Sequence, residues 1–398
     1  MSDSDTTRRR FLATLGLTGG AVVLTSLSAT SEAAAGATNS AAGQPATGPT
    51  TPVAGTDTTP VYLGSFSWTD PPGRGLDVGS RDTDGTITAT DTVAGVPDAS
   101  FLAFSPDRRF LYAVNELSPT GTVTALSLTD PWLPSPINTA STQGSAPTHL
   151  VVHPDGRFLI AANYGSGSVV VHPLAEDGSV GAATDLVQHV GDSRDPHAHQ
   201  VVIDPLDSRV IAVDLGADSV YVYSLDTASG TLRLDQQLRL ASGSGPRHLA
   251  FHPDGRHAYV LAELDSTITV LAWDPTTGFT TGATISSRAA GATGENFPAE
   301  IAVSADGRFV YASNRGDDDI AVFAVAEDGA SLTLLGTEST GGAWPRHFAI
   351  GPDGNHLYVA NQNSGAISRL PRDPESGLLS PVDATTEVPG VCVVAFLD

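Results

Sequence analysis

The sequence predicts an all-β protein, a seven-bladed β-propeller with four antiparallel strands per blade. Three observations lead to this prediction: six copies of a strand–turn–strand unit, a repeat of about 49 residues, and two chain ends that supply the parts of a seventh copy. Four short strands in a repeat of this length are typical of a propeller blade. No segment of the repeat region shows the 3.6-residue pattern of a helix.

The first 35 residues resemble an export signal rather than a part of the fold. Arg8, Arg9 and Arg10 precede a moderately apolar stretch that runs to about Leu27, and residues 33–35 are three alanines. Paired arginines, a weak apolar region and an Ala-x-Ala end are typical of a twin-arginine signal. The apolar stretch is diluted by Gly, Thr and Ser, and it is shorter than the roughly 20 apolar residues of a membrane span.

We therefore expect export by the twin-arginine machinery and no stable membrane insertion after cleavage. The predicted location is extracellular, periplasmic or cell-wall associated. Residues 36–57 are rich in Ala, Thr, Gly and Pro and have almost no bulky apolar side chains, which predicts a flexible linker. Residues 58–398 form the predicted propeller domain, which we expect to be monomeric.

Six copies of the repeat are marked by a turn of Pro-Asp-Gly-Arg type between two apolar strands. In such a turn Pro fixes φ, Asp caps the turn and Gly takes a positive φ. The steps from one turn Pro, or Ala305, to the next are 48, 51, 48, 52 and 47 residues. The turns are Ser105–Arg108, His153–Gly156, Asp204–Asp207, His252–Gly255, Ser304–Gly307 and Gly351–Gly354.

The two ends of the repeat region complete a seventh blade. Residues 389–396 match the first strand of the other copies, and residues 61–65 match the second strand. A blade shared between the termini closes the ring and leaves no open sheet edge.

Composition excludes several classes of function. The chain has 20 basic and 44 acidic residues, a net charge of −24, and every basic residue is Arg. Such an acidic surface repels nucleic acid, and the absence of Lys removes Schiff-base and P-loop chemistry. A single cysteine, Cys392, excludes an internal disulfide and a cysteine-cluster zinc site. We expect no cofactor.

Charged side chains gather at one end of the predicted channel. The start of the first strand and the end of the second lie at the same end of a blade, and therefore at the same mouth of the channel. The residues at both positions vary between copies. Arg247, Arg346 and several histidines occupy strand starts, while Glu263 and Arg315 occupy strand ends. Cations facing one channel mouth repel one another unless an anion lies between them. The pattern therefore predicts a site for a small anionic ligand.

The motifs around these residues resemble one family. In chain order they are Asp195-Pro-His-Ala-His199, Gly243-Ser-Gly-Pro-Arg-His248 and Ser313-Asn-Arg-Gly316. Together they are similar to the seven-bladed lactonases, which include propeller-type 6-phosphogluconolactonases and carboxy-muconate lactonizing enzymes. The resemblance spans residues 58–398. It implies an active site made of a His, two Arg and a Glu, which match His199, Arg247, Arg315 and Glu263.

The chemistry of these residue types fits lactone hydrolysis. A neutral His199 near pH 7 can accept a proton from the attacking water. Arg247 and Arg315 can bind a carboxylate or phosphate and stabilise the oxyanion. For Glu263 three roles are open: orienting His199, orienting an arginine, or returning a proton to the leaving alkoxide.

Further residues are candidates for substrate binding: Arg346, His197, Glu300 and His149. Arg346 can be a third anion contact or part of an ion pair between blades, and Glu116 and Glu300 can face the pocket or pair with Arg. His197 and His199 could also suggest a metal pair, but no third ligand stands out and nearby arginines disfavour a cation. We expect His248 and His347 to point to the other side of their strands and to serve packing.

Other side chains have predicted structural roles. We expect Asp214 and Asp218 to bind backbone groups in loops.

Three functions agree with this pattern. The favoured one is an exported lactonase for a small anionic lactone of the sugar-acid type. The alternatives are a cycloisomerase of the carboxy-muconate type and a propeller that binds a ligand or partner without catalysis. A propeller fold by itself does not decide between them.

Overall fold

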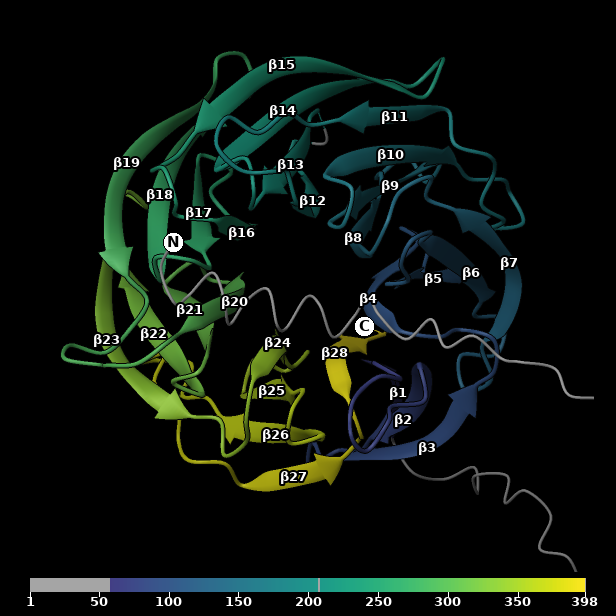
Figure 1. Cartoon of the computed structure of the whole chain (residues 1–398). Coiled ribbons are helices and arrows are strands. Elements are labelled where there is room, and N and C mark those ends of the chain that lie inside the picture. The colour runs from purple at the N-terminus through teal and green to yellow at the C-terminus, as the bar shows by residue number, and fades with distance from the viewer. Residues whose placement is uncertain (1–57, 207, 398) are drawn as a thin grey trace, which may run out of the picture. The chain divides into compact units, whose positions relative to one another are not determined.

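The computed structural model describes residues 58–206 and 208–397, and within them every regular element is a β-strand. The 28 strands form seven sheets of four antiparallel strands, arranged in a ring (Figure 1). The predicted propeller is confirmed. The predicted signal segment and the whole of the predicted linker lie outside the described residues.

The first strand of each sheet lies at the centre of the ring, and the other three follow outwards (Figure 1). The inner strands are β4 (Ala99–Phe104), β8 (Pro147–Val152), β12 (Ala198–Ile203), β16 (Pro246–Phe251), β20 (Phe297–Val303), β24 (Pro345–Ile350) and β28 (Val391–Phe396). The second strands are β1 (Thr59–Ser65), β5 (Phe110–Asn115), β9 (Phe158–Asn163), β13 (Val210–Asp214), β17 (His257–Ala262), β21 (Phe309–Arg315) and β25 (His356–Asn361).

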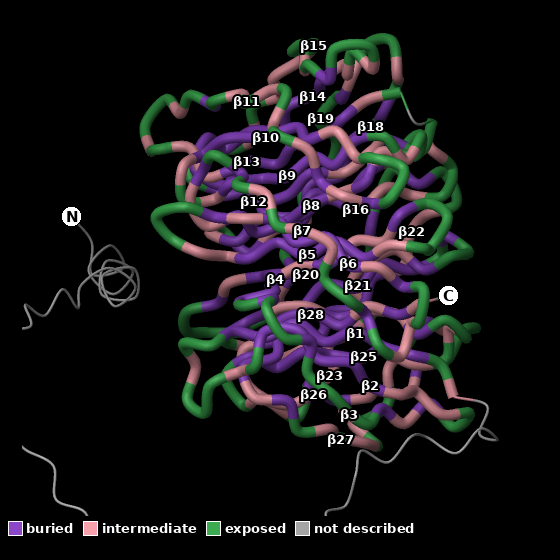
Figure 2. The backbone as a smooth tube through the Cα atoms, turned by 90° about the vertical axis from the view of Figure 1, so that its right-hand side faces the viewer, coloured by how far each residue is buried: buried purple, intermediate pink, exposed green. Residues whose placement is uncertain are grey.

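The outermost strand of each blade is more exposed than the other three, as Figure 2 shows for β7 and β15. The third strands are β2 (Leu76–Arg81), β6 (Thr122–Ser127), β10 (Ser168–Pro173), β14 (Ser219–Asp226), β18 (Thr267–Asp274), β22 (Asp319–Val325) and β26 (Ala366–Pro371). The outermost strands are β3 (Ile87–Val93), β7 (Ser135–Ser141), β11 (Asp185–Gln188), β15 (Thr231–Arg239), β19 (Gly278–Ser286), β23 (Leu332–Ser339) and β27 (Ala384–Glu387).

The ring closes through one blade that both chain ends build. Strand β28 pairs with β1, with Leu63 opposite Val394, and the sheet continues to β2 and β3. The turn chemistry is also as predicted, since Gly156 has a φ of 74° and its N–H donates to His153 O. Within the described residues no helix has the length and apolarity of a membrane span.

Apolar side chains between neighbouring blades form the core. One such cluster joins Ile160 and Val169 of one sheet to Val201 and Tyr221 of the next. At five blade interfaces a tyrosine of the second strand also donates its hydroxyl hydrogen to a backbone carbonyl in the next blade. These pairs are Tyr62–Pro131, Tyr112–Gly178, Tyr259–Gly329, Tyr311–Gly377 and Tyr358–Gly85, with O···O distances of 2.7–3.1 Å.

We expect Tyr259→Phe to lower the free energy of unfolding by about 1–2 kcal/mol, because the Gly329 carbonyl loses its buried donor. Tyr112→Phe should have an effect of the same size, since its contact with Gly178 repeats the same arrangement. Urea denaturation of both variants measures this. Unchanged stability in both would contradict a structural role for the repeated contact.

The high negative charge of the chain predicts that salt stabilises the fold. At about 0.01 M salt the Debye length is about 30 Å, so like charges repel across much of the surface, whereas at about 1 M it is about 3 Å. With a net charge of −24, we expect Tm to rise by several degrees between these salt concentrations. Scanning calorimetry measures this shift, and a Tm that stays constant or falls would contradict it.

Candidate active site

A β-bulge recurs near the start of every inner strand. In the first full blade Ala99 pairs with Asn115 and Phe101 with Val114, so that Ser100 is an extra residue. A bulge re-aims the side chains around it, and bulges are common beside active sites. The extra residues of the other blades are Thr148, His199, Arg247, the pair Ala299–Glu300 opposite Ser313, Arg346 and Cys392.

These bulges build one depression at the centre of the ring. Every inner strand contributes to its lining, which consists of Ser100, Phe101, Thr148, His199, Arg247, His248, Glu300, Arg346, His347 and Cys392. Of the eight predicted site residues, His199, Arg247, Glu300 and Arg346 line this depression directly.

Glu263 and Arg315 join the site through a chain of ion pairs. Arg315 Nη2 donates to Glu263 Oε2 at 2.7 Å, and Arg247 Nε lies 3.4 Å from the same oxygen. Arg315 also donates to the Phe297 carbonyl, and its guanidinium lies 5.3 Å from the centre of the Trp344 ring. Of the three roles left open for Glu263, these contacts support the orientation of arginines.

Arg247 is a buried cation with an incomplete set of counter-charges. It is 2% exposed, and Nη1 donates to the Ala299 carbonyl of the next blade. Burial, together with the charges of Arg315 and Arg346, lowers the pKa of Arg247 to about 9. A positive potential at a buried guanidinium favours the binding of an anion or of a developing oxyanion.

Arg346 combines the two roles that the sequence left open. It lines the depression, and its Nη2 lies 3.2 Å from Glu116 Oε2, two blades away around the ring. Its guanidinium lies 5.0 Å from the centre of the Phe66 ring. Burial raises the pKa of Glu116, and Arg346 opposes this rise.

His199 is buried in a cationic environment. It is 5% exposed, and its Nδ1 has no hydrogen-bond partner in the described part of the chain. Burial first, and then the charges of Arg247, His248, Arg346 and Arg315, hold the pKa of His199 well below 6.5. The imidazole is therefore neutral at pH 7, as a proton acceptor must be.

The other two predicted histidines lie beside the depression but do not line it. His149 stacks on Phe101 with 3.7 Å between ring centres. His197 stacks on Tyr164 at 4.6 Å, and its Nδ1 lies 2.9 Å from the Tyr164 carbonyl oxygen. Among the described residues no group of three or more His, Cys, Asp or Glu side chains has the arrangement of a metal site.

The expectation for His248 and His347 was wrong, since both line the depression. A bulge places two residues opposite one, so the strict alternation of sides fails at that point. The bulges lie between Pro246 and His248 and between Pro345 and His347, which brings each histidine to the channel beside the preceding arginine. Strand periodicity in the sequence gives no signal for such a bulge.

Asp214 and Asp218 bind backbone groups, as predicted. Asp214 accepts hydrogen bonds from the N–H groups of His197 and Ala217 and pairs with the buried His189 at 2.7 Å. Asp218 accepts from the N–H groups of Gly243 and Gly245. These contacts fix the loops that carry His197 and precede Arg247.

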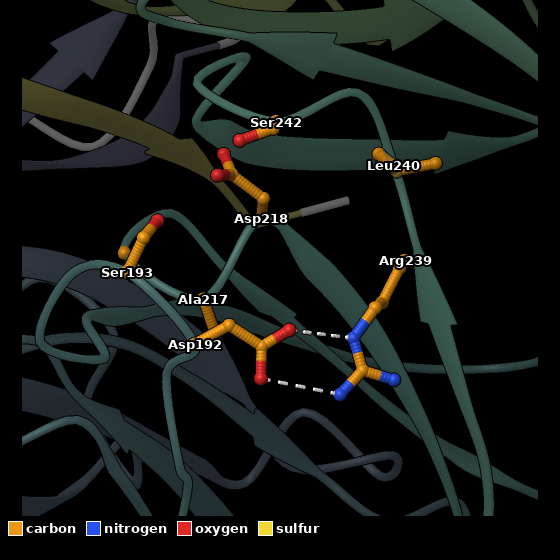
Figure 3. Close-up of a pocket in the computed structure, with 8 residues that line it drawn as sticks. Asp192, Ser193, Ala217, Asp218, Arg239, Leu240 and Ser242 are labelled. Carbon is orange, nitrogen blue, oxygen red and sulfur yellow. Dashed lines mark hydrogen bonds and ion pairs between the residues drawn. The ribbon is translucent and has the colours of Figure 1, made fainter.

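A second depression lies beside Asp218 (Figure 3). Two of its lining residues, Arg239 and Asp192, pair with each other: their side chains point toward each other, and Arg239 Nε donates to Asp192 at 2.9 Å. Both are largely exposed, unlike the arginines of the central depression.

Comparison with known proteins identifies the family of the chain. Residues 60–396 match the family model described as lactonase, 7-bladed beta-propeller. The chain belongs to this family. The resemblance drawn from the motifs is confirmed, and so is the expectation of an enzyme of the lactonase type.

Several relatives cover most of the chain. A 6-phosphogluconolactonase of Bacillus subtilis is 32% identical over 76% of this chain and 88% of its own length. The solved structure of a periplasmic gluconolactonase of Pseudomonas aeruginosa is 32% identical with a TM-score of 0.82, covering 86% of this chain and 99% of that one. A solved protein from Lactobacillus plantarum is 34% identical with a TM-score of 0.80, covering 86% and 100%.

Proposed function

We propose that this protein is an exported lactonase that hydrolyses a small lactone of the sugar-acid type, with anionic groups held by Arg247 and Arg315. One observation carries the proposal: Arg247 and Arg315 both pair with Glu263, and the neutral His199 is buried in the same site. Membership of the lactonase family supports the reaction type.

The first step follows from the charges of the site. His199 removes a proton from a water molecule as the water oxygen attacks the lactone carbonyl carbon. Arg247 stabilises the oxyanion that forms on the carbonyl oxygen, because its guanidinium is buried and already fixed by Ala299 and Glu263. Glu263 holds Arg315 and Arg247 in place, which lowers the cost of reorganisation during the reaction.

Export bears on the choice of substrate. Sugar phosphates are cytoplasmic metabolites and would be scarce outside the cell. Unphosphorylated sugar lactones need not be scarce there. The residues that resemble a twin-arginine signal support export, and the similar Pseudomonas protein is described as periplasmic. Expression of the full chain with Arg8 and Arg9 replaced by Lys, followed by cell fractionation, tests this: the variant should remain in the cytoplasm.

Proton release at constant pH from a panel of lactones tests the reaction. The panel contains gluconolactone, 6-phosphogluconolactone and a muconolactone, with protein that starts at about residue 36. Turnover of a sugar lactone supports the proposal, and the preferred substrate shows whether the phosphate contributes. Turnover of the muconolactone alone would favour the cycloisomerase, and binding without turnover of any compound would favour a ligand-binding propeller.

A further inference from the structure

His248 and Glu300 form a buried pair that the proposed first step does not use. His248 Nδ1 lies 2.9 Å from Glu300 Oε1. The same carboxylate oxygen accepts the Ile301 N–H at 3.0 Å, and the Glu300 N–H donates to Ser313 Oγ. The other oxygen, Oε2, lies 3.6 Å from His347 Nε2. The carboxylate and the imidazole ring are therefore held in one orientation.

The pair lies in the same depression as the proposed base. His248, Glu300 and His199 all line it, and the ring centres of His248 and His199 are 5.1 Å apart. His248 is 3% exposed, and its Nε2 has no hydrogen-bond partner within the described residues. A buried polar atom without a partner is costly to maintain, which points to a partner supplied by a ligand.

Burial favours the uncharged form of the pair. It raises the pKa of Glu300, and it lowers the pKa of His248 well below 6.5, with a further contribution from nearby arginines. The 2.9 Å contact allows a protonated Glu300 to donate its hydrogen to Nδ1, and in that arrangement the neutral ring carries its own hydrogen on Nε2. The charged and titratable groups that face the pair are Arg247, Arg315, Arg346, Glu263, His149, His199 and His347.

Hydrolysis of a lactone needs a second proton transfer. The ring oxygen leaves as an alkoxide, which is a poor leaving group unless a proton reaches it. Glu263 is engaged by two guanidinium groups, as described above. His248 differs from His199 in its partner, because a carboxyl group lies against Nδ1 of His248, whereas Nδ1 of His199 has no hydrogen-bond partner among the described residues.

We propose that His248, positioned by Glu300, donates the Nε2 proton to the ring oxygen of the lactone. The inference rests on the proposed lactonase function. The water oxygen bonds to the carbonyl carbon while its proton moves to His199. The acyl carbon–oxygen bond then breaks, its electron pair stays on the ring oxygen, and that oxygen takes the proton from His248. The Glu300 proton moves to Nδ1, and the proton on His199 returns to the pair through solvent.

Leaving-group dependence tests this role. Gluconolactone releases an alkoxide that needs a proton, whereas dihydrocoumarin releases a phenolate that does not. We expect His248→Asn to lower kcat/KM for gluconolactone by about 10²–10³ and for dihydrocoumarin by less than about tenfold. His199→Asn should lower both alike. Equal losses for the two substrates in His248→Asn, or no loss, would overturn the inference.

The pH dependence of kcat/KM is an independent readout, and it needs only gluconolactone, the substrate with the alkoxide leaving group. The wild-type kcat/KM should fall at high pH as the pair loses its proton, and this fall should be absent in His248→Asn. Glu300→Gln should retain more activity than His248→Asn, because an amide N–H can also donate to Nδ1 and keep the hydrogen on Nε2. The same fall at high pH in His248→Asn would overturn the inference.

Controls separate the possible failures. His257→Asn removes another histidine paired with a carboxylate, Asp254, in a turn at the start of β17, and should leave both rates unchanged. Thermal unfolding establishes that each variant is folded. If the wild type hydrolyses no lactone, the proposed function fails and the inference fails with it. If the wild type is active but His248→Asn behaves as the wild type does, only the inference fails.

Discussion

Replacing Arg247 with alanine is expected to lower kcat/KM for the lactone by about 10²–10³, the usual effect of losing one oxyanion donor. The guanidinium is 2% exposed and is fixed by the Ala299 carbonyl and by Glu263. It therefore acts in a site from which water is largely excluded, where charge stabilisation is strong. Arg247→Lys should recover only part of the loss, because an ammonium group cannot reproduce the planar fork of a guanidinium.

Steady-state kinetics by proton release measures both variants. Arg239→Ala is the matched control, since this arginine is also paired with a carboxylate, Asp192, but lies in the second depression (Figure 3). Its rate should equal that of the wild type. Equal losses in Arg247→Ala and Arg239→Ala would contradict the assignment of the central site.

The second large effect is expected at His199. His199→Asn should lower kcat by about 10²–10⁴, the contribution of a general base. Burial and neighbouring cations hold the pKa of His199 well below 6.5. A base acts in its neutral form, so kcat/KM should stay high as the pH falls to 6.5 and decline only below that value.

Substrate binding should move this decline. An anionic substrate such as 6-phosphogluconolactone, bound between Arg247 and Arg315, would offset the charges that depress the pKa of His199, so with this substrate the decline of kcat should lie at higher pH than that of kcat/KM. Profiles of both parameters between about pH 4 and 8 measure the difference. A decline of kcat/KM centred above pH 6.5, or one that persists unchanged in His199→Asn, would contradict the role of His199 as base.

The repeat in the sequence was sufficient for the fold. Turn residues such as Pro154 and Gly156 are local signals with a fixed conformation, and their spacing gives the number of blades. The shared blade could also be predicted, because the sequences of β28 and β1 match the first and the second strand of the other copies.

The site could be predicted only in part. A cluster of Arg, His and Glu residues stands out because these residues depart from the repeat at positions that face one end of the channel. The choice of His199, Arg247, Glu263 and Arg315 within that cluster comes from the resemblance to the lactonase family. The partners of Glu263 and the direction of His248 depend on strand register and on the bulge between Pro246 and His248. Both are consequences of tertiary packing, which a pattern of alternating residues does not encode.

A crystal structure with the hydroxy-acid product bound tests the central claim most directly, because it places the ligand. Gluconate is the product of the unphosphorylated candidate and can be soaked into crystals of the protein from about residue 36. The account predicts density in the central depression, with the carboxylate of the product at Arg247 and within hydrogen-bond distance of His199. Density only in the depression beside Arg239, or elsewhere on the propeller, would contradict it.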